Sequence, residues 1–311
     1  MTPKTQKIIS AVINGLAAFG GFAVLIKILN LNQVGAYVST AFYVWLFFAL
    51  QTIFLYDLHL KESRAWDKAK ANTNGLVSWI EALRRRMAHF KDWSFLHKWL
   101  NYLLLPGIIF WSTISVFFTN FGFIKIQVFF ALLSGTALVL NYWYIKEVFS
   151  RNKEKADQDV FVGLSMVKIY ASALMYGSSL SLIRHYCLHP GYFFWGAFAL
   201  TFLLIYQALY QHRLVNIKNL LVTMGISGIM SALAYWTAIF WGYNYISAAI
   251  FLGVFYNFFW GVFHYHLDRS LTRRAFAEIL IVSLAIAAMA LGTTNFKAKI
   301  FDSCQYQQLK F

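Results

Sequence analysis

The sequence predicts an all-α protein, a polytopic bundle of about nine transmembrane helices. Three observations lead to this class. The 311 residues are 59% hydrophobic and only 13% charged, which leaves too little polar surface for a soluble domain. Most apolar residues lie in runs long enough to cross the hydrocarbon core, which takes about 20 residues per helix. Only three prolines occur in the chain, so these helices are expected to be largely unbroken.

Each apolar run is interpreted as one span. The first run, residues 8–29, follows Lys4 and Lys7 in the manner of a signal peptide. It is too long for one and lacks a clear cleavage site, so it is expected to be a retained helix. The predicted spans cover residues 8–29, 35–56, 100–119, 125–144, 160–183, 192–210, 220–240, 245–263 and 276–291. For the closely spaced pairs, a re-entrant turn is the alternative to two spans.

One basic amphipathic helix is expected in the loop at residues 57–99. Apolar residues recur there at steps of three and four, which places them on one helix face. Glu81, Arg84, Arg85 and Lys91 lie elsewhere on the helix. Such a helix is expected to lie in the headgroup plane of the membrane rather than to recognise a partner. The apolar face consists of Leu76, Trp79, Ile80, Leu83, Met87 and Phe90.

The formal charge of +15 indicates orientation in a membrane, not binding of nucleic acid. With nine spans and a cytoplasmic N-terminus, the cytoplasmic segments hold 20 of the 27 lysine and arginine residues. This distribution follows the positive-inside rule and suits an anionic inner leaflet. We therefore expect one membrane domain over residues 1–311, in the cell (inner) membrane, with an outer C-terminal tail at about 292–311.

Polar side chains that suit metal ligation or acid–base chemistry gather where three predicted spans reach the cytoplasmic side. Imidazole and carboxylate groups there suit Fe, Zn or Mn. His264 and His266 diverge by about 200° on a helix, so both bind one ion only if the helix has already ended. The simpler alternative is that these residues sit at the interface without a catalytic role. The candidate metal ligands are His59, His212, His264 and His266, and Asp57 and Asp268 are the candidate catalytic carboxylates.

Three basic residues are candidates for binding an anionic substrate. Arg273 and Arg274 follow the eighth span and are expected to clamp a headgroup. Lys168 lies about eight residues into the fifth span, and an ionisable residue at membrane depth is a functional hypothesis by default. The favoured alternative for Lys168 is that its long stem reaches back to the cytoplasmic headgroups.

A second candidate site lies in the outer loop after the fifth span. His185 and His189 are four residues apart, which would place them on one side of a helix. Pro190 disfavours helical geometry at His189, so a plain loop is the favoured interpretation. Cys187 in the same loop and Cys304 in the outer tail either form a disulfide or remain two thiols.

Two classes of function remain open. The first is a membrane-embedded enzyme that acts on a lipid or isoprenoid from the cytoplasmic side, with the His/Asp cluster as metal ligands or acid–base groups. The second is a transporter, a channel or a non-catalytic subunit, in which the same residues are interfacial. Phosphate-binding glycine loops and His-Glu-x-x-His motifs are not present. The enzyme is slightly favoured, because few charges are buried and no span is broken by Gly or Pro.

Overall fold

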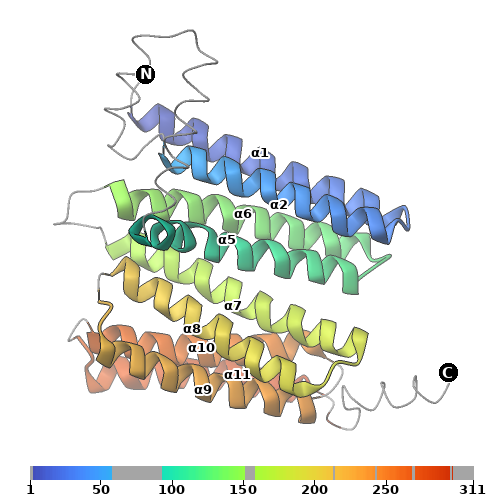
Figure 1. Ribbon diagram of the computed structural model, residues 1–311. Helices are drawn as coiled ribbons and strands as arrows, with labels where there is room; N and C mark the ends of the chain where they lie inside the picture. Colours follow the sequence, from blue (N-terminus) through green and yellow to red (C-terminus); the bar gives the residue numbers. More distant parts are fainter. Residues whose placement is uncertain are drawn as a thin grey trace. The chain divides into compact units, whose positions relative to one another are not determined.

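The computed structural model describes residues 3–57, 93–150, 158–212, 214–241, 244–267, 270–294 and 296. Within these residues the chain is helical and contains no strand, so the predicted all-α class is confirmed (Figure 1). The described helices are α1 (Pro3–Asn30), α2 (Val34–Asp57), α5 (Trp93–Thr119), α6 (Ile124–Ser150), α7 (Gln158–Tyr186), α8 (Pro190–Gln211), α9 (Ile217–Phe240), α10 (Tyr245–Leu267) and α11 (Arg273–Gly292).

Each described helix contains an apolar stretch long enough to cross a membrane. The described part of the chain thus has nine candidate spans, as the sequence predicts. The protein is a multi-pass integral membrane protein. The predicted amphipathic helix and the outer tail lie outside the described residues, except for the first residues of the tail.

Tight turns separate two of the closely spaced pairs of spans. Asn32, between α1 and α2, has φ 60°, and Gly122, between α5 and α6, has φ 81°. Glycine and asparagine tolerate this left-handed conformation better than other residues. The chain therefore reverses direction within a few residues at both places.

The chain forms two compact units. Unit 1 comprises residues 1–107 and 131–164, and unit 2 comprises residues 108–130 and 165–311. In unit 1, α1 packs against α2. In unit 2, α8 packs against α9, and α10 packs against both α9 and α11. That the chain folds as one domain stays a prediction.

Small residues set the spacing of α7 and α10 within unit 2. A Cβ atom added to Gly253 would lie 2.9 Å from the Cβ of Ala173, and one added to Gly177 would lie 2.9 Å from the Cβ of Ala249. Small residues at such crossings allow helix backbones to approach closely in a membrane. The two contacts run in opposite directions along the two helices, so α7 and α10 are antiparallel.

Candidate functional site

Lys168 lies in the interior of unit 2. Its side chain is 2% exposed, and its Nζ donates a hydrogen bond of 2.6 Å to Oε1 of Gln211 at the end of α8. The Trp260 ring lies with its centroid 5.9 Å from the same Nζ. The expectation that Lys168 extends to the headgroups is therefore wrong, because an amide oxygen and an aromatic face receive its amino group inside the bundle.

Two predicted site histidines come together beside Lys168. His212 caps the C-terminus of α8, and His264 lies in the last turn of α10. The centroids of their rings are 4.7 Å apart, and the Trp260 ring is 5.4 Å from that of His264. The ends of three helices that are separate in the sequence therefore bring a lysine, a glutamine and two imidazoles to one place.

Burial decides the charge of His212. Its partial burial, and then the positive charges of Lys168 and His264, lower its pKa to about 3. The imidazole of His212 is therefore neutral near pH 7. A neutral imidazole offers a lone pair that accepts a proton or binds a metal.

Polar side chains continue from this cluster into the bundle. The hydroxyl groups of Tyr176 on α7 and Thr201 on α8 are 2.6 Å apart, and both residues have no exposed surface. Tyr256 precedes Trp260 by four residues and is also fully buried. Its hydroxyl group has no hydrogen-bond partner among the described residues, and neither does Nε2 of Gln211.

Of the remaining predicted metal ligands, His266 is described, and it does not join the two imidazoles. Helix α10 continues to Leu267, so His266 diverges from His264 and is exposed. The condition under which both would bind one ion is not met. His59 and Asp268 lie outside the described residues, and Asp57 ends α2 without a described side chain. Within the described part of the chain, no three His, Cys, Asp or Glu residues gather.

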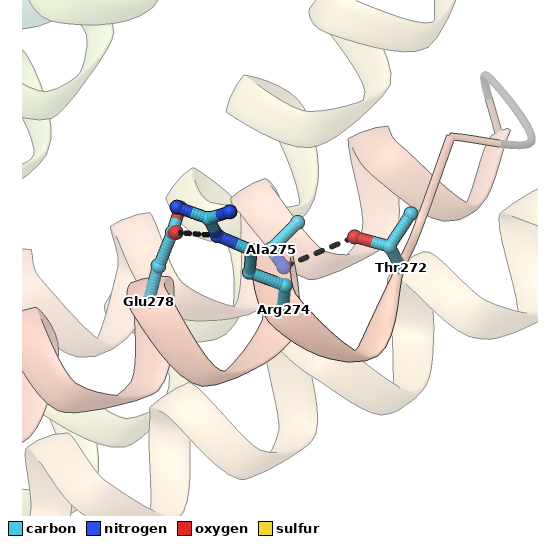
Figure 2. A network of polar contacts seen from close by, with 4 residues as sticks. All are labelled: Thr272, Arg274, Ala275 and Glu278. Carbon is cyan, nitrogen blue, oxygen red and sulfur yellow. Dashed lines mark hydrogen bonds and ion pairs between the residues drawn. The ribbon is translucent and has the colours of Figure 1, made fainter.

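Arg273 and Arg274 lie in the first turn of α11, at its exposed surface. Nε of Arg274 and Oε1 of Glu278 form an ion pair of 2.8 Å (Figure 2). Thr272 begins the helix, because its hydroxyl group accepts a hydrogen bond of 3.1 Å from the backbone of Ala275. Arg274 therefore already has a carboxylate partner within its own helix.

The second predicted site forms two unrelated contacts. His185 is exposed, and its ring lies 5.3 Å from that of Phe118. His189 precedes α8, and its Nδ1 accepts a hydrogen bond of 3.1 Å from the backbone of Gly191. Helix α7 ends before His189, so the two residues do not share a helix face. Between them, Cys187 is disulfide-bonded, and Cys304, the only other cysteine, lies outside the described residues.

Three residues of the cluster were not predicted from the sequence: Gln211, Tyr256 and Trp260. Two of them could have been found from the sequence, because Tyr256, Trp260 and His264 recur at steps of four residues and so share one helix face. Comparisons with protein-family models, with curated proteins and with solved structures gave no match.

Proposed function

We propose that the protein is a membrane-embedded enzyme that acts on the anionic headgroup of a lipid or isoprenoid at the cytoplasmic ends of α7, α8 and α10. The observation that carries this proposal is the pair of imidazoles, His212 and His264, with ring centroids 4.7 Å apart beside the buried Lys168. General acid–base catalysis needs two such groups within reach of one substrate.

Each residue of the cluster would have its own role in the reaction. Lys168 and the unpartnered Nε2 of Gln211 are hydrogen-bond donors suited to the oxygen atoms of a phosphate or carboxylate. The neutral His212 would take a proton from an attacking hydroxyl group. His264 would return a proton to the oxygen that leaves.

A metal-dependent version of this enzyme needs more ligands than the two imidazoles. Zinc in a catalytic site takes three protein ligands as a rule, so at least one more would come from outside the described residues, with His59 and Asp268 as the candidates. Elemental analysis separates the two versions. Stoichiometric iron, zinc or manganese that is lost in His264→Ala supports the metal, and its absence from the wild-type protein supports metal-free acid–base chemistry.

An assay of substrate turnover tests whether the protein is an enzyme. The protein would be reconstituted in nanodiscs that contain phosphatidic acid or farnesyl phosphate, and mass spectrometry would follow the loss of either compound. We expect His212→Asn and His264→Asn to lower the rate by about 10²- to 10⁴-fold. His266→Asn, two residues away on the exposed side of α10, is the matched control and should retain the rate. Equal rates in all three variants would contradict the proposal.

The second candidate function is that of a carrier, which moves the same lipid or isoprenoid across the membrane. The buried contact between Tyr176 and Thr201 favours this function. These hydroxyl groups lie near the middle of their spans, deeper than a headgroup reaction needs. Binding without chemical change of either compound, together with its uptake by proteoliposomes, would favour the carrier over the enzyme.

A further inference from the structure

Three fully buried hydroxyl groups lie in unit 2 beyond the cluster around Lys168. Tyr176 on α7, Thr201 on α8 and Tyr256 on α10 have no exposed surface. Tyr176 and Thr201 share one hydrogen bond, with their side-chain oxygen atoms 2.6 Å apart. The hydroxyl group of Tyr256 has no hydrogen-bond partner among the described residues. A buried donor without an acceptor is costly, so Tyr256 calls for an acceptor that the described residues do not supply.

The hydroxyl groups follow the Lys168 cluster along the antiparallel helices α7 and α10. Tyr256 precedes Trp260 by four residues, which places it on the same face of α10 and about 6 Å further along the helix axis. The ring of Trp260 has its centroid 5.9 Å from the Nζ of Lys168. On α7, Tyr176 follows Lys168 by eight residues, and it interacts electrostatically with Tyr256. The contact between Lys168 and Trp260 is thus succeeded, further into the bundle, by the one between Tyr176 and Tyr256.

A lipid that binds Lys168 by its anionic headgroup would extend from there towards Tyr256. In phosphatidic acid, two ester groups follow the phosphate by a few covalent bonds, and a carbonyl oxygen accepts hydrogen bonds but donates none. An isoprenyl phosphate has only hydrocarbon beyond its phosphate. Against hydrocarbon the hydroxyl group of Tyr256 stays without an acceptor, whereas an ester carbonyl supplies one. The buried donor therefore favours a lipid with ester-linked chains.

We infer that the substrate is a diacyl glycerolipid, not an isoprenoid, and that Tyr256 donates a hydrogen bond to one of its ester carbonyl groups. This inference rests on the proposed binding of an anionic headgroup at Lys168. It applies to the enzyme and to the carrier alike, because both bind the same lipid. Tyr256 is then a specificity-determining residue of the site, outside the acid–base pair of His212 and His264.

Binding in nanodiscs of ether-linked phosphatidylcholine tests this inference, because that bilayer contains no ester carbonyl group that could compete. The ligands would be dioleoyl phosphatidic acid, its ether-linked analogue with chains of the same length, and farnesyl phosphate. All three carry the phosphate that Lys168 would bind. We expect the wild-type protein to bind the diacyl compound about three- to tenfold more tightly than the ether analogue, which is the ratio that one neutral hydrogen bond provides.

Two tyrosine variants locate the ester preference. Tyr256→Phe removes only the hydroxyl group, so it should lower the affinity for the diacyl compound by the same factor and leave the affinities for the other two ligands unchanged. Tyr245→Phe on the same helix is the matched control, because the hydroxyl group of Tyr245 already donates a hydrogen bond of 3.0 Å to Oδ1 of Asn120. This control variant should keep the ester preference.

The wild-type protein alone keeps the test decisive if Tyr256→Phe does not fold. Equal affinity of the wild-type protein for the diacyl compound and its ether analogue would overturn the inference and would assign the hydroxyl group of Tyr256 to buried water. Tighter binding of farnesyl phosphate than of phosphatidic acid would overturn it too. An ester preference that persists in Tyr256→Phe would likewise contradict it.

These results are distinguishable from failure of the proposed function. If the wild-type protein binds the three phosphates equally and Lys168→Met binds none of them, the proposed headgroup site stands and only the ester contact is wrong. If the wild-type protein binds none of the three, the proposed function fails and this inference fails with it.

Discussion

The amino group of Lys168 donates a 2.6 Å hydrogen bond to the side-chain oxygen of Gln211, and both residues are buried within a membrane-spanning unit. The partner is a neutral amide, not a carboxylate. This contact therefore satisfies one hydrogen-bond donor of Lys168 without placing a negative charge beside it.

The strength of this contact is measurable by a double-mutant cycle. Gln211→Leu leaves the amino group of Lys168 without its acceptor and should lower the free energy of unfolding by about 1–3 kcal/mol. Lys168→Met removes the group that needs the acceptor, so the double variant should be more stable than Gln211→Leu alone. Thermal unfolding in detergent provides the four values. Strictly additive effects would mean that the two side chains do not interact.

The close approach of α7 and α10 depends on Gly253. Its replacement by leucine would place side-chain atoms against the Cβ and backbone of Ala173, 2.9 and 3.3 Å from the new Cβ. We expect Gly253→Leu to push the helices apart, to lower the unfolding midpoint and to weaken any binding at Lys168. Gly225→Leu on α9 is the control, since no atom lies within 4 Å of its added Cβ. A midpoint for Gly253→Leu as high as that of the control would show that the crossing is not tight.

The depressed pKa of His212 gives a pH dependence with a definite sign. Its pKa is about 3 in the folded protein and about 6.5 in an unfolded chain. Between these values the unfolded state binds more protons, so stability falls as the pH drops from 6.5 towards 3. His212→Asn should reduce the slope over this range by up to about 1.4 kcal/mol per pH unit. Unfolding curves between pH 4 and 8 test this, and an unchanged slope would contradict the burial of the imidazole.

The basic loops and the nine candidate spans of the described residues predict an orientation of the chain in the membrane. The N-terminus and the segment between α8 and α9 should face the cytoplasm, and the segment between α7 and α8 should face outward. Alkaline phosphatase fused after Cys187 should be active, and the same enzyme fused after Val215 should be inactive. The reverse pattern would place the Lys168 cluster on the outer side.

Most of the fold was predictable from sequence because the bilayer imposes one simple requirement. Every buried backbone group must be satisfied within a helix, and a helix of fixed rise needs about 20 apolar residues to cross. The starts and ends of spans were harder to predict. The eighth span was expected to end at residue 263, whereas α10 continues to Leu267 and keeps His264 and His266 on a helix.

The site was only partly predictable, for a physical reason. His212 and His264 were recognised as polar residues at span ends, but their meeting depends on which helices are neighbours, and apolar composition says nothing about that. Lys168 was expected to reach the headgroups because its partner, Gln211, lies 43 residues away in the sequence. In the sequence, Trp260 and Tyr256 cannot be distinguished from the other aromatic residues of a span, because the polar groups beside them come from neighbouring helices.

Binding of an anionic headgroup by Lys168 is the most direct test of the account. Titration of phosphatidic acid in nanodiscs of phosphatidylcholine would compare the wild-type protein with Lys168→Met and with Lys125→Met, an exposed lysine of the same unit. The account predicts saturable binding by the wild-type protein and by Lys125→Met, and at least a tenfold weaker affinity for Lys168→Met, about 1.4 kcal/mol. Equal affinity of all three proteins would contradict it.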